Sequence, residues 1–191
     1  MKKILSIVLP LMIYSQGALA MQSMIGNVSL SDANYDSLKI TGIAKLSKVI
    51  VKQDLQITGP ATLENGTSIE GSLKIIGPSN LSDTSITNAN LIGPVKADNI
   101  TAKKEVRIIG PTECKKCQFS GHLDITAKEA TLKDSTFSTI TFRKDNENRK
   151  QKLEIIGKSE VKGDIVIEGS DCEVVVGKEA KMFGKIVRTR M

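Results

Sequence analysis

Two cysteines separated by two lysines, Cys114-Lys115-Lys116-Cys117, form the most reactive local pattern in the chain. Zinc binding at such a pair requires about four ligands, and only His122 and Cys172 remain as further candidates. A thioredoxin-like redox pair requires a helix that begins after a strand, and the surrounding pattern predicts none. Two interpretations stay open: both thiols occupy small apolar core positions, or they form a local disulfide in an oxidising compartment. Cys172 is then the odd cysteine, either buried or free to pair with another chain.

The other residues that could perform acid–base chemistry are scattered. His122 is the only histidine, and without a nearby nucleophile at a defined turn we expect it at the surface. Asp124 and Glu154 fall at one outward position of the repeat described below. Their neighbours at that position form a mixed polar row, so two glycosidase carboxylates cannot be assigned. No phosphate loop or metalloprotease motif is present. We therefore expect no catalytic residue, no cofactor and no metal.

A Gly-Pro dipeptide returns every 16 to 18 residues, at Gly59, Gly77, Gly93 and Gly110. Each glycine closes a short run with apolar residues at alternate positions, as in 55–59 and 73–77. Alternation with a period of two predicts a strand, and the glycine and proline predict a corner after it. A turn that repeats in step with a strand indicates one structural unit stacked on itself.

Each repeat holds two or three short strands separated by turns, which predicts an all-β, single-stranded parallel β-helix, right-handed, with coils of about 17 residues. We expect roughly eight coils and a rod of about 40 Å. Further apolar positions follow the glycines at Leu46, Leu63, Leu81, Ala97, Cys114 and Val161. An antiparallel sandwich is the rival architecture, but its hairpins would give less uniform repeats.

The chain divides into a leader and one domain. Lys2 and Lys3, an apolar run and a small-x-small sequence at 18–20 predict a secretory signal peptide over 1–20. Residues 21–37 are expected to form an N-terminal cap segment, and 38–191 the β-helix domain, with a charged insertion at 143–152. The apolar run of the leader is short for a membrane anchor, and no later stretch is long enough to span a membrane. The expected location is therefore periplasmic or secreted.

The charge pattern indicates which classes of partner the protein could bind. The formal net charge is +6, of which Lys2 and Lys3 supply two, so the processed chain is near +4. Its basic residues are mostly scattered, tryptophan is absent and other aromatic residues are few. Nucleic-acid binding proteins usually combine a basic stripe with stacking aromatics, so we expect no nucleic-acid partner. Attraction to an anionic surface or an envelope polysaccharide fits better.

One outward position of the repeat contains isoleucine on three adjacent coils. It holds, coil by coil, Thr41, Thr58, Ile76, Ile92, Ile109, Thr126, Arg143 and Ile156. Alternation should direct these side chains away from the core. Ile76, Ile92 and Ile109 would then form an apolar stripe on three adjacent coils, and a contiguous apolar patch often marks an interface. Alternatively, residues 21–37 or the 143–152 insertion fold over it.

Short motifs resemble two solenoid families. Residues 161–165 and 177–186 contain Gly-Asp-Ile and Gly-x-x-Ala-x-x-Phe-Gly sequences and resemble bactofilin repeats over the last thirty or so residues. Apolar steps of five residues, at Leu81, Ile86 and Leu91 and again at Leu132, Phe137 and Phe142, resemble pentapeptide-repeat solenoids. The bactofilin resemblance implies a right-handed β-helix that polymerises end to end without nucleotide. The secretory leader departs from that family, whose members generally act on the cytoplasmic side.

Together these features predict an exported, non-catalytic structural or adhesive β-solenoid that binds a protein partner or self-associates. Two alternatives remain: a protein that binds or cleaves an envelope polysaccharide, and a bactofilin-like polymer-forming protein.

Overall fold

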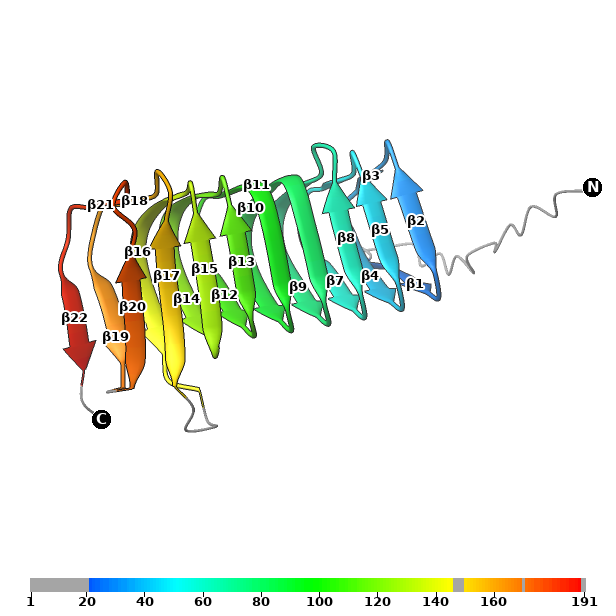
Figure 1. Ribbon diagram of the computed structural model, residues 1–191. Helices are drawn as coiled ribbons and strands as arrows, with labels where there is room; N and C mark the ends of the chain where they lie inside the picture. Colours follow the sequence, from blue (N-terminus) through cyan, green and yellow to red (C-terminus); the bar gives the residue numbers. More distant parts are fainter. Residues whose placement is uncertain (1–20, 146–149, 170, 190–191) are drawn as a thin grey trace, which may run out of the picture.

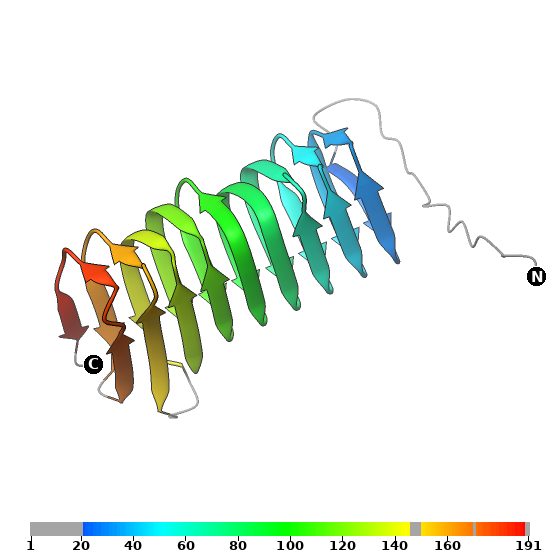
Figure 2. The ribbon, with the colours of Figure 1, turned by 45° about the horizontal axis from the view of Figure 1, so that its top comes forward.

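The chain forms a straight rod of parallel strands wound into about ten turns of about 17 residues each (Figures 1 and 2). This computed structural model describes residues 21–145, 150–169 and 171–189. Within those ranges there are 22 strands and no helix, so none that is long and apolar enough to cross a membrane. The predicted all-β parallel solenoid is confirmed, with about two more turns than the repeat count indicated.

The strands stack into three faces, and every pairing between strands is parallel. The first face holds β1 (Met21–Ile25), β4 (Ser37–Thr41), β7 (Leu55–Thr58), β12 (Val106–Ile109), β19 (Ile165–Glu168) and β22 (Ile186–Thr189). The second holds β2 (Val28–Ser31), β5 (Ala44–Ser47), β8 (Ala61–Glu64), β13 (Thr112–Lys115), β15 (Glu129–Lys133), β17 (Gln151–Ile156) and β20 (Cys172–Val176). The third holds β3 (Asn34–Tyr35), β6 (Ile50–Val51), β18 (Glu160–Val161) and β21 (Lys181–Met182).

Five longer strands continue around corners between faces and fill the middle of the rod. They are β9 (Ser68–Ile76), β10 (Ser79–Ile92), β11 (Val95–Ala102), β14 (Gln118–Thr126) and β16 (Thr136–Arg143). Because the register is parallel, equivalent residues of successive coils lie directly above one another. The core is thus a set of continuous inward columns, such as Leu38, Leu55, Leu73, Ala89, Val106, Leu123, Ile140 and Ile165, all of them buried.

The corner between the first and second faces is built on stacked glycines. Gly59, Gly77, Gly93 and Gly110 have φ between 130° and 141°, the left-handed region that favours glycine. A Cβ on any of them would collide with the carbonyl oxygen of the glycine one coil earlier. The predicted corner role of the Gly-Pro repeat follows from both constraints: a positive φ, and the close approach of the neighbouring backbone.

The corner between the second and third faces is formed by non-glycine residues with positive φ, which the sequence pattern did not indicate. Seven non-glycine residues there have positive φ, namely Asp32, Lys48, Asn65, Asp83, Asn99, Lys116 and Asp134. Asn and Asp tolerate this conformation better than most residues because their short polar side chains bond locally. These side chains also link coils: the Nδ2 atom of Asn99 donates to Oδ1 of Asp83 on the previous coil at 2.6 Å.

The two flanking segments differ from a simple cap and loop. Residues 21–37 do not stand apart from the repeat, because β1, β2 and β3 pair in register with β4, β5 and β6 and form the first coil. At the insertion, Arg143 ends β16 and Gln151 begins β17, so only 144–150 separate the strands. Residues 146–149 of that insertion lie outside the described residues, as does the predicted signal peptide at 1–20.

The insertion also shifts the phase of the repeat. Leu153–Gly157 resembles the strand before each glycine corner, but β17 pairs with β15 on the second face. Glu154 therefore lies opposite Thr131, and Ile156 lies opposite Lys133. The sequence predicted Ile156 in the same column as Arg143, and Glu154 in the same column as Asp124. Both placements were wrong, because the extra residues of the insertion move the strand from the first face to the second. The neighbour of Arg143 on the following coil is Glu168.

Candidate functional site

The isoleucine stripe is continuous in register. Ile92 is paired with Ile76 on one side and with Ile109 on the other, on adjacent strands of the first face. Ile76 is 41% exposed, and Ile92 and Ile109 are half-buried. Successive side chains are separated by one strand spacing, about 4.8 Å. The three isoleucines therefore form a short outward ladder.

The prolines of the repeat form a second ladder beside the first. Pro78, Pro94 and Pro111 are exposed. Their carbonyl oxygens accept hydrogen bonds from the coil before, as when the amide of Val95 donates to Pro111. Only a row of glycines, which have no side chains, separates the two ladders. We call the six side chains Ile76, Ile92, Ile109, Pro78, Pro94 and Pro111 the apolar ridge. It lies at the corner between the first and second faces, where strands such as β8 and β13 begin, and these strand starts run along the lower edge of the rod in Figure 1.

A polar groove of about 360 Å³ lies on the first face beside the isoleucines. Its lining includes Gln56, Lys74, Asn90 and Arg107 from one outward column and Asp54, Ser72, Asn88 and Glu105 from the next. The Oδ1 atom of Asn90 is buried and has no hydrogen-bond partner among the described residues. Amides and charges at this spacing can bind hydroxyl and carboxylate groups. The two carboxylates, Asp54 and Glu105, are three rungs apart, roughly 14 Å, which is wider than the roughly 5 to 9.5 Å that glycoside hydrolysis uses.

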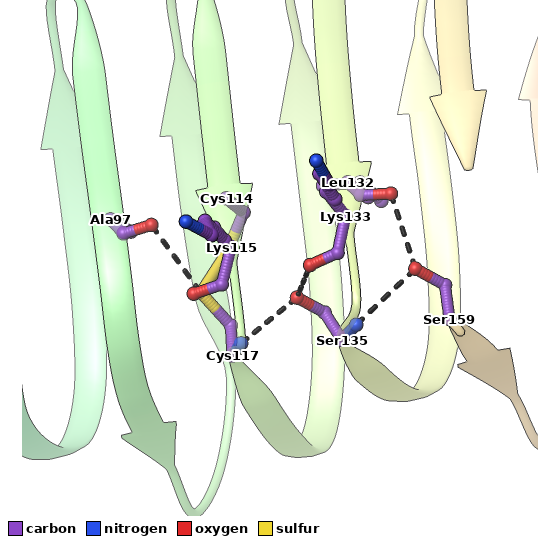
Figure 3. The surroundings of a disulfide bond; sticks show 8 residues. All are labelled: Ala97, Cys114, Lys115, Cys117, Leu132, Lys133, Ser135 and Ser159. Carbon is purple, nitrogen blue, oxygen red and sulfur yellow. Dashed lines mark hydrogen bonds between the residues drawn. A yellow bond between two sulfur atoms is a disulfide. The ribbon is translucent and has the colours of Figure 1, made fainter. Parts of the chain in front are cut away.

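The paired cysteines lie inside the rod (Figure 3). Cys114 and Cys117 are joined by a disulfide and are almost completely buried, with a Cα–Cα distance of 6.2 Å. Cys114 occupies the same inward column as Leu132. The amide of Cys117 donates to Oγ of Ser135 at 2.9 Å, and that hydroxyl donates to the carbonyl of Lys133. The disulfide therefore fills a core position and offers no open reactive site.

Cys172 is a free thiol that is also buried. Burial raises the pKa of this thiol above its ordinary value, while the nearby Arg188 partly opposes the shift. A raised pKa keeps the thiol protonated at neutral pH, where it is a poor nucleophile. It therefore does not supply a nucleophile for catalysis at neutral pH.

His122 and Asp124 were both considered for chemistry, and each is held by a neighbouring coil. The Nδ1 atom of His122 lies 2.8 Å from Oγ1 of Thr139. Asp124 points outward but is only 4% exposed, because Arg143 of the next coil covers it. Arg143 also donates to Glu168 at 2.9 Å. Its hydrogen bond to Asp124, followed by the attraction of that carboxylate, raises the pKa of the guanidinium.

Sequence reasoning did not find this Arg143 cluster, because Asp124, Arg143 and Glu168 are separated by 19 and 25 residues and belong to two outward columns. Glu154 has a separate partner: the ammonium of Lys152 lies 2.6 Å from its carboxylate. That hydrogen bond lowers the pKa of Glu154. A general acid usually needs a raised pKa, so this shift of Glu154 argues against such a role.

The C-terminal end of the rod is open in the described part of the chain. No described strand pairs with the outer edges of β20, β21 and β22. Phe183 is 66% exposed there, and Val176, Ile186 and Val187 are exposed as well. Arg188 stands in the column of Ile167, at an inward position, and its guanidinium donates to the carbonyl of Cys172 at 2.9 Å. One arginine thus lies over the end of a core that is otherwise exposed.

No group of three or more metal-ligating side chains occurs within 21–145, 150–169 and 171–189. No protein-family model, curated protein or solved structure matches the chain. The fold and the surfaces described above are thus the basis for any functional assignment.

Proposed function

We propose that the protein is an exported, non-catalytic structural solenoid that self-associates or binds a protein partner. The observation that carries this proposal is that no described strand covers the outer edges of β20, β21 and β22. Sheet edges with unpaired backbone groups are places where another chain can add strands, and natural proteins usually cover them. Here the last coil combines such edges with exposed Phe183, Ile186 and Val187. Exposed apolar side chains beside unpaired strand edges favour association with another chain.

A second copy of the same chain suits this end because it offers strands of the same length and spacing. End-to-end association would give a longer rod or a filament, since a head-to-tail contact that does not close produces an open assembly. This is also what the bactofilin resemblance of the C-terminal motifs implies. The export step rests on the predicted leader at 1–20 and remains part of the proposal.

Sedimentation velocity over a range of protein concentrations tests the proposal. We expect species larger than the monomer to grow with concentration, and the variant Phe183→Asp to shift the distribution towards monomer. Ile50→Lys is a matched control because Ile50 is an exposed isoleucine of β6, far from the end. Monomers at all concentrations, confirmed by dispersed particles in negative-stain microscopy, would count against self-association.

Binding of an envelope polysaccharide is the second candidate, and the polar groove on the first face favours it. Its amides and charges run beside the isoleucine ladder, so a sugar chain could find hydrogen-bonding groups next to an apolar strip. A glycan array and a reducing-end assay separate the possibilities. Array binding without new reducing ends would support a lectin-like role, and release of sugar ends would refute the non-enzyme proposal.

A further inference from the structure

Basic side chains border the apolar ridge on both sides. On the first face, the outward column next to the isoleucine ladder holds Lys39, Gln56, Lys74, Asn90 and Arg107. On the second face, the column next to the proline ladder holds Lys45, Thr62, Asn80, Lys96 and Glu113. Five of these ten residues are cations and one is an acid. Asp124 follows Arg107 in the same column, where Arg143 covers it, and Asp54 and Glu105 stand one column farther from the ridge.

Most of these cations form no ion pair with another described residue. Lys39, Lys74, Lys96 and Arg107 are exposed, and none forms an ion pair with another described residue. Lys45 is the exception, with its ammonium 3.1 Å from Glu64. Unpaired positive charge thus runs along the first-face side of the apolar strip at Lys39, Lys74 and Arg107, and Lys96 adds one such charge on the second-face side.

We propose that the apolar ridge and its flanking cations dock the rod side-on to an anionic lipid surface. Peripheral membrane binding combines buried apolar area with attraction between basic residues and acidic headgroups. The ridge is a straight convex edge, which fits a flat, deformable surface. A protein partner would have to supply a matching trough, and a polyanionic sugar would use the cations without using the isoleucines.

The spacing supports contact along the length of the rod. Lys39 and Arg107 stand four rungs apart in one column, about 19 Å, with Lys74 between them. Several headgroups can therefore be contacted at once. The apolar side chains would lie beside the row formed by Lys39, Lys74 and Arg107, at the depth where headgroups meet acyl chains. This mode leaves the C-terminal end free, so it goes beyond the proposed self-association and does not depend on it.

Vesicle co-sedimentation of the processed protein tests the proposal. The probes are vesicles of phosphatidylcholine alone and of phosphatidylcholine mixed with phosphatidylglycerol. We expect binding only to the mixed vesicles, weakened by added salt. The double variant Lys74→Gln/Arg107→Gln should bind about thirtyfold more weakly, since each basic residue near an anionic surface contributes about fivefold. Ile76→Ser/Ile92→Ser should also weaken binding, by a loss that persists at high salt.

A matched control is Lys103→Gln/Lys133→Gln, which removes the same charge from exposed positions away from the ridge. It should change vesicle binding by less than about threefold. Equal losses in both charge variants would overturn the proposal in favour of attraction by net charge alone. Absence of binding by the unmodified protein would also overturn it. Binding to soluble dextran sulfate that requires Lys74 and Arg107 but not Ile76 would favour a polyanionic sugar instead.

Discussion

The Nε atom of Arg143 lies 2.8 Å from both carboxylate oxygens of Asp124, although the two residues belong to neighbouring coils and to different outward columns. The arginine reaches diagonally across the sheet and donates to Glu168 on its other side. It therefore ties three consecutive coils together just before the 144–150 insertion. The contact also removes Asp124 from solvent, so this carboxylate depends on its partner.

Replacement of Arg143 should destabilise the rod. Arg143→Ala removes the charge-assisted hydrogen bonds to Asp124 and Glu168, and hydrogen bonds to charged groups contribute about 1.5–3 kcal/mol. We expect a loss of about 2 kcal/mol in the free energy of unfolding, measured by urea denaturation. The control Lys133→Ala removes an exposed cation for which no ion pair with a described residue is seen. It should change the free energy of unfolding by less than about 0.5 kcal/mol. Equal effects in the two variants would contradict this role of Arg143.

The stacked glycines of the corner can be tested by comparing alanine substitutions at two glycines. Gly93 and Gly66 both have positive φ, but a Cβ at Gly93 would meet the carbonyl of Gly77, whereas nothing lies within 4 Å of a Cβ at Gly66. Gly66→Ala should cost about 1 kcal/mol for the backbone conformation alone. Gly93→Ala should cost at least about 2 kcal/mol more, because the backbone of two coils must move apart. Thermal or urea unfolding of the two variants measures the difference, and similar midpoints would show that the coils separate easily.

Thiol counting tests the arrangement of the cysteines. Without reductant, native protein should react with iodoacetamide at none of its cysteines at neutral pH, because Cys172 is buried and its pKa is raised. Denaturant alone should expose one thiol, and denaturant with reductant should expose three. Mass spectrometry of the adducts distinguishes the states. Three adducts under denaturing, non-reducing conditions would mean that Cys114 and Cys117 are free thiols in the core.

A buried hydroxyl near the disulfide offers another test. Ser135 accepts a hydrogen bond from the amide of Cys117 at a site that is 2% exposed. Ser135→Ala leaves that amide unsatisfied and should lower the free energy of unfolding by about 1–3 kcal/mol. Ser138→Ala removes an exposed hydroxyl that donates to the carbonyl of Ser120, so its effect should be well under 1 kcal/mol. A Ser135→Ala variant as stable as the wild type would indicate that water replaces the hydroxyl.

The Lys152–Glu154 pair predicts a pH effect with a definite sign. The hydrogen bond from Lys152 lowers the pKa of Glu154 in the folded state. The ion pair therefore stabilises the fold at pH values above the ordinary pKa of a glutamate. That contribution is lost as the pH falls through the lowered value. Lys152→Ala should raise the pKa of Glu154 towards its ordinary value, which NMR titration of the carboxyl carbon measures. An unchanged pKa would mean that the ion pair does not persist in solution.

Most of the fold could be predicted because the repeat is local. A strand, a glycine and a proline every 16 to 18 residues determine the register, and the alignment of Ile76, Ile92 and Ile109 followed directly from it. The same alignment placed Cys114 and Cys117 at inward positions, where both are buried. Whether the isoleucines form an interface is still a prediction.

The prediction of register failed beyond Arg143 because periodicity says nothing about how far an insertion carries the chain around the rod. Leu153–Gly157 has the right alternation for either face, and only the pairing of β17 with β15 decides between them. Contacts between columns were equally hidden. The ion pair of Arg143 with Asp124 joins two different columns. Aligning equivalent positions of the repeats reveals only neighbours within one column.

The stacked glycines impose a constraint that runs in one direction along the rod. Each glycine makes room for the carbonyl of the glycine one coil nearer the N-terminus, so every coil restricts the one that follows it. After Gly110 the same place is taken by Ala127, which does not have a positive φ, and the series ends. A gene duplication that copied a whole coil between Gly42 and Gly110 would lengthen this corner by about 4.8 Å without breaking the series. A copied coil without the glycine would stop it, so the number of consecutive glycine coils sets how long a straight edge the protein can present.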